Sequence, residues 1–378
     1  MRETDELITM CRFAGSGVAL GQGAGGNASV KSAGGEAMLI KASGYRLSAV
    51  REGHGYLKMR LPEPQRLETA VEGLEDQAAS KSLSSLMQSL VLDSTSLRPS
   101  METWFHVVLD RVVLHTHPIY ANAFSCMEGG NAALGDLLPV RPTFVEYRKP
   151  GHALGIAIRD ISNAYRDGHG HRPRQMLLAN HGLIASADSA VSAIAATQEI
   201  LDAGERFFGK LGDDQLTPRE PNSSLTRWAN HLGRKYRETT SRAIVTRAGR
   251  FAALQQIDSE RPDPLVPDDV ICNGESILAA RENETAEDFV ERNIRSLNFT
   301  AAIAVPDRGY VFLAPTVGML DAMEEQLLAN VLVRRLIRAK GRCRALPESE
   351  IAPLLSMEQE KHRRSVLTGA EEPSLCRS

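Results

Sequence analysis

The sequence predicts an α/β protein of two domains, and three observations support this. From residue 99 to about residue 210, short apolar runs typical of buried strands alternate with longer stretches that have the apolar spacing of helices. A cluster of Gly, Asp, Pro, Asn and Ser residues between positions 212 and 223 interrupts this pattern, and a second alternation follows. The chain has 378 residues, which is long for one average domain and sufficient for two. We therefore expect a larger α/β domain over residues 1–212, a linker with a helix over 213–265, and a small α/β domain over 266–378.

The first domain is expected to open with a helix over residues 4–17, where Thr4 has a side chain suited to the N-cap. A glycine-rich turn over residues 21–26 then leads into two short strands over 28–31 and 37–41. Residues 61–98 are polar and mixed, which predicts a helix between loops. The elements expected after residue 99 are helices over about 101–110, after Pro118, over 153–166 and over 188–208, and strands over 112–117, 143–147 and 176–179.

The second domain shows its own pattern of strands and helices. Residues 270–272 form a short apolar run and are expected to be a strand. Residues 301–305 and 310–313 are expected to pair as a hairpin. Helices are expected over residues 286–296 and 320–338.

The composition is that of an ordinary globular protein, with 42% hydrophobic and 24% charged residues. A net charge of −3 argues against a nucleic-acid-binding surface, which would be strongly basic. No apolar run approaches the roughly 18 residues that a membrane span needs, and early acidic residues make the N-terminus unlike a signal or transit peptide. We therefore expect a cytoplasmic protein that binds neither nucleic acid nor membranes. The widely spaced cysteines, without a Cys-x-x-Cys pair, are expected to be reduced thiols: Cys11, Cys126, Cys272, Cys343 and Cys376.

Two histidines at the end of one expected strand are the first candidate site residues. Side chains alternate between the faces of a strand, so His115 and His117 project from the same face, where two imidazoles can bind one ion. An isolated His-x-His pair is more often a pair of core histidines that hydrogen-bond to the backbone. Here, however, Pro118 stops a buried strand directly after the pair, and functional residues tend to lie at such ends. A second pair, His169 and His171, lies in a glycine- and arginine-rich stretch and is expected to be a solvated loop.

Two further side chains complete a candidate metal site. Glu102 stands at the start of an expected helix, where the helix macrodipole alone would explain a carboxylate. His181 follows an apolar run, and a single histidine in that position is more often structural. Together, three imidazoles and one carboxylate suit a catalytic zinc ion or another divalent cation such as Mn²⁺. In that setting Glu102 can ligate the ion or act as a general base whose pKa the metal tunes.

Two glycine-containing segments are candidates for binding an anion. Glycines let backbone N–H groups converge on a phosphate, and neighbouring Asn and Ser side chains add donors. The segments are the turn at 21–26 with Asn27 and Ser29, and Ala42-Ser43-Gly44. Each is weak evidence alone, because most such segments are simply tight turns. They are not a dinucleotide fingerprint, since the glycines follow an expected helix and precede strands, and no Walker lysine is present.

The order of these motifs resembles the class II aldolase/adducin family over about residues 5–210. The motifs that carry this resemblance are Gly26-Asn27-Ala28-Ser29, Ala42-Ser43-Gly44, Pro99-Ser100-Met101-Glu102, His115-Thr116-His117-Pro118 and Asn180-His181-Gly182. Residues 147–151, 345–348 and 356–361 are similar to the aldolase part and connector of bifunctional rhamnulose-phosphate aldolase/alcohol dehydrogenase proteins. Those proteins continue into a short-chain dehydrogenase domain, which is not expected here because the sequence ends at Ser378 without a nucleotide fingerprint.

The resemblance implies a fold, an assembly and a set of site residues. The fold is a three-layer α/β/α sandwich around a largely antiparallel sheet, to which this chain adds a smaller C-terminal α/β domain with a structural or capping role. Members of the family usually form tetramers, so a homo-oligomer is expected. The resemblance implies that His115, His117 and His181 are the zinc ligands and that Glu102 is the catalytic acid/base. The residues that it assigns to the substrate phosphate are Gly26, Asn27, Ser29, Ser43, Gly44 and Ser100.

These observations lead to a specific functional hypothesis. The chain is expected to be a metal-dependent aldolase that cleaves or forms a ketose 1-phosphate or related sugar, with dihydroxyacetone phosphate and an aldehyde as products, through a metal-stabilised enediolate. A sugar-phosphate 4-epimerase on the same scaffold, a non-catalytic adducin-like binding module and a dehydrogenase activity are the alternatives. Single-domain relatives commonly carry a second serine where this chain has Met101, and this change removes a hydroxyl from the expected phosphate site.

Overall fold

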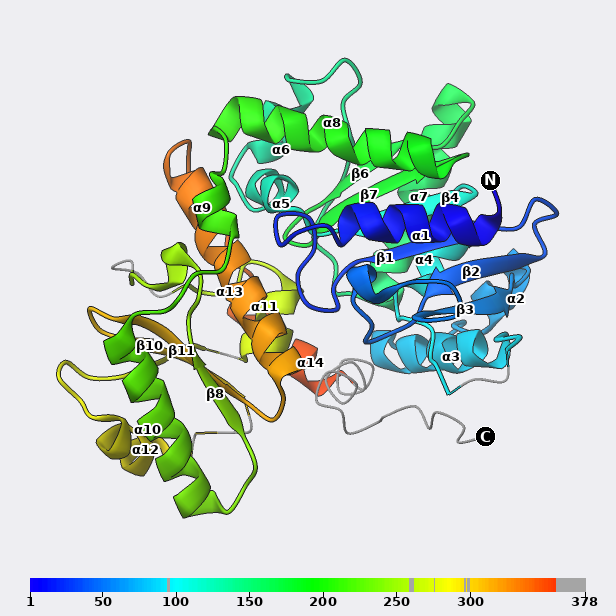
Figure 1. The fold of residues 1–378 in the computed structure, drawn as a ribbon. Helices are drawn as coiled ribbons and strands as arrows, with labels where there is room; N and C mark the ends of the chain where they lie inside the picture. The colour runs from blue at the N-terminus through cyan, green and yellow to red at the C-terminus, as the bar shows by residue number, and fades with distance from the viewer. Residues whose placement is uncertain (94–95, 258–261, 275, 296, 298–299, 358–378) are drawn as a thin grey trace. The chain divides into compact units, whose positions relative to one another are not determined.

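The structure is a computed structural model that describes residues 1–93, 96–257, 262–274, 276–295, 297 and 300–357 (Figure 1). The chain divides into two compact units. Among the described residues, unit 1 comprises residues 1–208 and 341–344, and unit 2 comprises residues 209–340 and 345–357. Both units contain a sheet and helices, as the α/β prediction requires. In the described residues, no helix combines the length and the apolar character that crossing a membrane would need.

Unit 1 is built on a seven-stranded sheet with the order β3-β2-β1-β4-β7-β6-β5. The β5–β6 pair is parallel and the other neighbouring strands are antiparallel, which confirms the expected largely antiparallel sheet. The strands are β1 (Asn27–Lys31), β2 (Ala37–Lys41), β3 (Tyr56–Arg60), β4 (Val112–Thr116), β5 (Thr143–Val145), β6 (Gln175–Leu178) and β7 (Gly182–Ala187).

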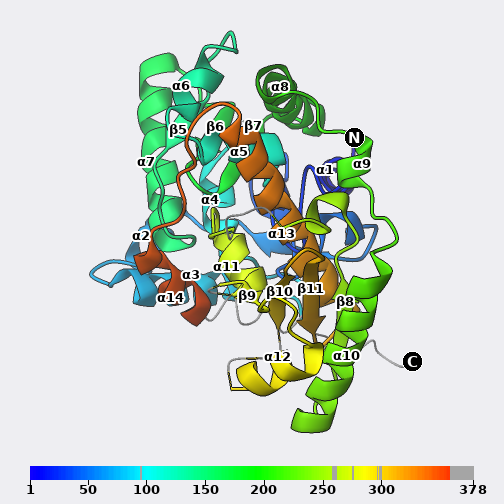
Figure 2. The same cartoon turned by 90° about the vertical axis from the view of Figure 1, so that its left-hand side faces the viewer.

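Helices cover both faces of this sheet and complete the three-layer sandwich (Figures 1 and 2). The first face carries α1 (Glu3–Ala14), α5 (Ile119–Ser125), α6 (Gly130–Gly135) and α8 (Ala190–Phe208). The opposite face carries α2 (Pro64–Thr69), α3 (Asp76–Ser89), α4 (Thr103–Val108) and α7 (His152–His169). A short 3₁₀ helix spans Leu47–Ala49.

The alternation of side chains along β4 explains how one strand serves both layers. Val112 and Leu114 pack in the cluster that contains α1 and α8. Val113 points the other way, into the cluster that contains Phe105 of α4 and residues of α7. His115 continues this second face, since its ring lies edge-on to Phe105 with the ring centroids 5.4 Å apart. The period of two along a buried strand therefore sends the histidine to the α4 side of the sheet.

An ion pair between the buried Glu6 and the half-buried Arg111 connects α1 to the residue that precedes the central strand β4. The Glu6 side chain is only 6% exposed and accepts two hydrogen bonds from Arg111, at 2.6 and 2.7 Å. The same carboxylate accepts from the backbone N–H of Ala190 at the start of α8, at 3.2 Å. Three elements from distant parts of the sequence thus meet at one carboxylate.

We predict that Arg111→Ala lowers the free energy of unfolding by about 3 kcal/mol, because it leaves the buried Glu6 carboxylate without its charged partner. Urea denaturation measures this change. Arg166→Ala is the control, since Arg166 is exposed and its side chain pairs, among the described residues, only with its exposed neighbour Asp167. An Arg111 variant as stable as this control would contradict the role of the pair.

The sequence did not predict several elements of unit 1, and it predicted one helix where the structure has two. The described residues between 61 and 98 form two helices, α2 and α3, where one was expected. Strands β3 and β7 and helix α6 were not predicted. The β7 strand escaped because its run of buried residues follows β6 after only a short turn. Asn180 makes this turn with a left-handed φ of 51°, which turns the chain back as an antiparallel neighbour.

Unit 2 contains a four-stranded sheet with the order β8-β11-β10-β9. Strands β10 (Ala301–Val305) and β11 (Gly309–Ala314) pair antiparallel, which confirms the predicted hairpin, and β8 (Val245–Ala248) and β9 (Leu278–Ala279) flank them. Helices α10 (Ser223–Thr240) and α12 (Ala286–Asn293) pack on one face, and α13 (Val317–Arg338) lies on the other (Figure 1). The remaining helices of unit 2 are α9 (Asp213–Leu216), a 3₁₀ helix over Ala252–Leu254, α11 (Pro267–Asn273) and α14 (Glu348–Ser356).

Two expectations for this part of the chain differ from the structure. Residues 270–272 lie in α11 and are not a strand. Pro267 begins this helix, and the buried Asp269 carboxylate accepts hydrogen bonds from the N–H groups of Leu265 and Val266 at its start. Residues 213–265, expected as a linker with a helix, supply α10 and β8 to the sheet and core of unit 2. Three predicted features lie outside the described residues. They are the end of the 286–296 helix, residues 358–361 of the connector motif, and Cys376.

Candidate metal centre

Four side chains of unit 1 converge on one small volume. They are Glu102, His115, His117 and His181, and each offers a ligand atom that lies within 4.8 Å of those of the others. His115 is the fourth residue of β4 and His117 follows that strand directly. Glu102 is the N-cap of α4, and His181 lies in the turn between β6 and β7. The structure therefore brings together all four residues that the sequence singled out for a metal.

The two histidines of the β4 end face each other closely. The Nε2 atoms of His115 and His117 are 3.0 Å apart, and the residues are 0% and 4% exposed. At the usual Zn–N distance of roughly 2.0–2.1 Å, two ligand nitrogens at a tetrahedral angle lie about 3.3 Å apart. The observed separation is close to this value.

The hydrogen bonds of His115 define which of its nitrogens can bind a cation. Its Nδ1 lies 3.0 Å from the carbonyl oxygen of Leu183, which can only accept a hydrogen bond. Nδ1 therefore carries the proton and donates it, and Nε2 presents its lone pair to the cluster. A backbone carbonyl that orients the far nitrogen of an imidazole is the usual support of a histidine metal ligand.

The carboxylate of Glu102 lies between two of the imidazoles. Its Oε1 is 3.3 Å from Nε2 of His115 and 3.3 Å from Nε2 of His181. Burial alone would raise the pKa of Glu102, but its electrostatic interactions with the adjacent imidazoles of His115 and His181 outweigh burial and hold this pKa well below its usual value. The carboxylate is therefore ionised and provides a negative charge in the cluster.

The third imidazole is neutral at physiological pH. Burial is the main reason that the pKa of His181 falls to about 4, and the nearby His115 and His117 lower it further, against the effect of the hydrogen bond to Glu102. The cluster thus combines imidazole lone pairs with one carboxylate inside a buried site. Three imidazoles and one carboxylate are the ligands that a divalent cation such as Zn²⁺ prefers. This set suits a metal site better than a cluster held together only by hydrogen bonds.

Gly182 allows β7 to close against the two histidines of the β4 end. A Cβ at this position would lie 2.6 Å from the carbonyl oxygen of Thr116 and 2.7 Å from Cδ2 of His117. Both distances are too short for real atoms, so any larger residue must displace the backbone or the imidazole. The glycine is therefore a steric requirement of the cluster.

We predict that Gly182→Ala weakens metal binding by about tenfold, because it displaces the ring of His117. It should also lower the free energy of unfolding by about 1–3 kcal/mol through overpacking. Competition with a chromophoric chelator measures the first effect and urea denaturation the second. Gly168→Ala is the matched control, since a Cβ there meets no atom within 4 Å. Equal metal affinity in the two variants would contradict the steric argument.

The candidate anion-binding residues fall into two groups beside the cluster. Gly26 has a left-handed φ of 72°, and a Cβ there would lie 2.8 Å from the carbonyl oxygen of His115. Asn27 is the strand partner of His115, and its buried Nδ2 has no hydrogen-bond partner among the described residues. Ala42 forms a bridge with Pro99, which places Ser43 and Gly44 beside the segment that holds Ser100. The Ser100 hydroxyl accepts a hydrogen bond from the backbone N–H of Glu102, at 3.1 Å.

Ser29 lies apart from these groups in its contacts. Ser29 is fully buried, and its hydroxyl lies 2.8 Å from Nδ1 of His106. His106 is a buried histidine of α4 whose ring stacks on Phe105. Burial is the main reason that the pKa of His106 lies well below its usual value, and the nearby His115 lowers it further. No motif of the sequence indicated His106, although its position four residues after Glu102 places it one helical turn further along α4.

Lys41 is a second residue that sequence analysis missed. It is 2% exposed, and its ammonium donates hydrogen bonds to the carbonyl oxygens of Ala24 and Tyr45, at 3.3 and 2.8 Å. It therefore ties the glycine-rich turn to the segment around Ser43. A lysine at the end of a strand gives little indication of such contacts, because they depend on two loops that meet only in the folded chain.

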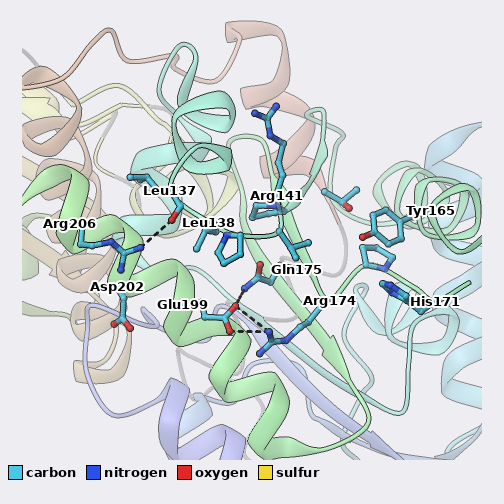
Figure 3. Close-up of a pocket in the computed structure, with 15 residues that line it drawn as sticks. Leu137, Leu138, Arg141, Tyr165, His171, Arg174, Gln175, Glu199, Asp202 and Arg206 are labelled. Carbon is cyan, nitrogen blue, oxygen red and sulfur yellow. Dashed lines mark hydrogen bonds and ion pairs between the residues drawn. The ribbon is translucent and has the colours of Figure 1, made fainter. Parts of the chain in front are cut away.

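A surface groove of about 400 Å³ lies elsewhere in unit 1 (Figure 3). No residue of the four-residue cluster lines it. Arg174 and Gln175 both donate hydrogen bonds to the carboxylate of Glu199, at 3.0 and 2.9 Å, so the charges of Arg174 and Glu199 are paired within the groove. His171 is one of its lining residues, and both histidines of the second His-x-His pair are exposed, as expected. His169, however, is the last residue of α7 and does not lie in a loop.

The comparison with known families agrees with the fold of unit 1. The model of the class II aldolase and adducin N-terminal domain matches residues 5–205, which is more than half of the chain. The chain therefore belongs to the class II aldolase/adducin family. All four residues of the cluster lie within the matched region.

Individual relatives are distant. An uncharacterised oxidoreductase of Bacillus subtilis, YuxG, is 25% identical over 214 residues, which cover 54% of this chain and 29% of that protein. A 3-oxo-tetronate 4-phosphate decarboxylase of Haemophilus influenzae is 26% identical over 175 residues, 42% of this chain and 79% of that protein. The match thus spans less than a third of YuxG. Among solved structures, a class II aldolase domain from Thermoplasma acidophilum is similar at 20% identity and a TM-score of 0.45, over 54% of this chain and 93% of that chain.

Proposed function

We propose that the chain is a metal-dependent lyase that cleaves, or in reverse forms, a carbon–carbon bond in a ketose 1-phosphate or related phosphorylated sugar. The products of cleavage are dihydroxyacetone phosphate and an aldehyde. The observation that carries this proposal is the buried cluster of three imidazoles and one carboxylate in a family of metal-dependent aldolases. Such a cluster holds both a cation and a group that can move a proton at the same place.

The three histidines are proposed to hold the cation, with Zn²⁺ as the first choice and Mn²⁺ as an alternative. When bound, a divalent cation supplies Lewis-acid stabilisation of negative charge on substrate oxygens. The pKa of His181, lowered to about 4, keeps its imidazole free of a second proton for this task. The hydrogen bond from His115 to Leu183 fixes the ring that presents Nε2.

Glu102 is proposed to move the proton. Its carboxylate is ionised and lies 3.3 Å from two of the imidazoles, which places it beside the proposed cation site. In cleavage it takes up the proton of the hydroxyl on the carbon that becomes the aldehyde, the carbon–carbon bond breaks, and it delivers that proton to the carbon that the aldehyde leaves. In synthesis the same two transfers run in reverse. The Ser100 hydroxyl, which binds the Glu102 N–H, fixes the start of the helix that carries this carboxylate.

The two glycine-containing segments are proposed to bind the phosphate. Gly26 and Asn27 lie beside His115, and the bridge from Ala42 to Pro99 brings Ser43, Gly44 and Ser100 together. The buried ammonium of Lys41 adds a positive charge beneath both segments. For Ser29 we propose a supporting role through His106, because its hydroxyl is already engaged there.

Products distinguish this proposal from its competitors. Purified protein, stripped with a chelator and then restored with Zn²⁺, is incubated with a small panel of ketose 1-phosphates. Metal-dependent release of dihydroxyacetone phosphate supports the aldolase. An inverted pentulose phosphate with no such release supports a 4-epimerase instead. Release of carbon dioxide from a 3-oxo acid phosphate supports a decarboxylase, the activity named for the Haemophilus influenzae relative.

Elemental analysis and size-exclusion chromatography with light scattering test the remaining parts of the proposal. Protein that neither contains nor is activated by a divalent metal would favour an adducin-like binding module. A tetramer in solution is expected, since a homo-oligomer is the usual state implied by the resemblance. Reduction or oxidation of a nicotinamide cofactor by the chain would instead support a dehydrogenase.

A further inference from the structure

A four-residue segment near the C-terminus, residues 341–344, belongs to unit 1 although the residues on both sides of it belong to unit 2. It lies beside the end of α5. The backbone N–H of Glu128 donates to the carbonyl of Arg342 at 3.0 Å, and Met127 and Cys343 form a bridge. The N–H of Arg344 donates to the carbonyl of Cys126 at 2.7 Å. The segment is therefore held by a regular set of backbone contacts.

Arg344 binds both ends of one side-chain amide. Its Nε donates to Oδ1 of Asn180 at 3.1 Å, and its own carbonyl accepts from Nδ2 of Asn180 at 2.7 Å. Its Nη2 also donates to the carbonyl of Ser125 at 3.1 Å. Asn180 is 3% exposed, so its amide needs these partners inside the protein.

Asn180 directly precedes the metal-ligand candidate His181. Its φ of 51° lies in the left-handed region, which an Asn tolerates and most other residues avoid. This conformation turns the chain from β6 to β7 and thereby sets the direction of the His181 side chain. A contact that holds the Asn180 side chain thus acts on the position of the imidazole next to it.

We propose that Arg344 is a positioning residue of the metal centre, which through Asn180 holds His181 in place beside Glu102. This rests on the metal-binding part of the proposed function. Arg344 touches none of the four cluster residues in the contacts described for it, so its influence passes through the turn. Partners of metal ligands typically contribute 10–100-fold to metal affinity, which sets the size of the expected effect.

The test compares full-length variants by their affinity for Zn²⁺ alone, measured by competition with a chromophoric chelator. Arg344→Ala should weaken Zn²⁺ binding by about tenfold or more. Arg344→Lys should restore part of the loss, because one ammonium cannot serve both Asn180 and Ser125 as the guanidinium does. Arg342→Ala is the matched control from the same segment, since only the backbone of Arg342 makes the contact with Glu128.

Two further measurements separate positioning from a general loss of structure. The absorption spectrum of the Co²⁺-loaded protein should change in Arg344→Ala and stay as in the wild type in Arg342→Ala, while the urea midpoints of the metal-free proteins stay similar. Asn180→Gly keeps the left-handed backbone accessible but removes the amide. Adding Arg344→Ala to it should then have little further effect on Zn²⁺ affinity.

The outcomes distinguish this inference from the proposed function. If Arg344→Ala binds Zn²⁺ as tightly as Arg342→Ala does, the positioning role is overturned and the metal site is unaffected. The same conclusion follows if the losses of Zn²⁺ affinity caused by Arg344→Ala and Asn180→Gly simply add in the double variant. A wild-type chain that binds no metal would overturn both. A chain that binds Zn²⁺ in an Arg344-dependent manner but cleaves no sugar phosphate would retain the inference and overturn the proposed reaction.

Discussion

Replacement of His117 by alanine is expected to remove the metal and abolish turnover. The His117 imidazole lies 3.0 Å from that of His115, and among the described residues only these two and His181 supply imidazoles to the cluster. Two imidazoles and one carboxylate remain, which is a poorer set for a zinc ion than the four groups present in the wild type. Elemental analysis of the purified variant and the product assay on a ketose 1-phosphate measure the two effects.

His171→Ala is the matched control for this prediction. His171 is also the second histidine of a His-x-His pair, but it is exposed and lines the separate groove of Figure 3. The His171→Ala variant should keep the metal content and turnover of the wild type. A His117→Ala protein that is active and contains a full complement of metal would refute the assignment of His117 as a ligand.

The central part of the site was predictable because it follows from local geometry. The alternation of side chains along a strand places His115 and His117 on one face whatever the rest of the fold does, and the structure confirms this. The convergence of Glu102 and His181 with that pair required the order of motifs along the chain as well. No local pattern alone gives it, since Glu102 and His181 are 79 residues apart.

Features that depend on contacts between distant segments were not predictable. Arg344 binds Asn180 across 164 residues of sequence, and nothing around residue 344 indicates that partner. The helix over Pro267–Asn273 was mistaken for a strand because a three-residue apolar run fits both, and the hydrogen bonds to Asp269 that stabilise its start are visible only in three dimensions. The binding of Ser29 to His106 likewise depends on α4 packing against β1.

Replacement of Glu102 by glutamine is expected to slow turnover on the order of 10²-fold or more, because the amide cannot accept and return a proton as the carboxylate does. Glutamine has nearly the same shape, and the three imidazoles that hold the cation are unchanged. The variant should therefore keep its fold and most of its metal. The measurement is kcat for cleavage of the ketose 1-phosphate, together with the metal content of the same preparation.

The metal content decides what a slow Glu102→Gln enzyme means. If the metal is retained and kcat falls, the Glu102 carboxylate acts in proton transfer. Its contacts of 3.3 Å with His115 and His181 then belong to the protein without substrate. If metal and activity are lost together, Glu102 is chiefly a ligand, and another group must move the proton. Glu146→Gln, an exposed carboxylate outside the cluster, controls for the loss of one charge. Turnover at the wild-type rate would remove Glu102 from the mechanism, and the buried His106, one helical turn further along α4, would be the next residue to test.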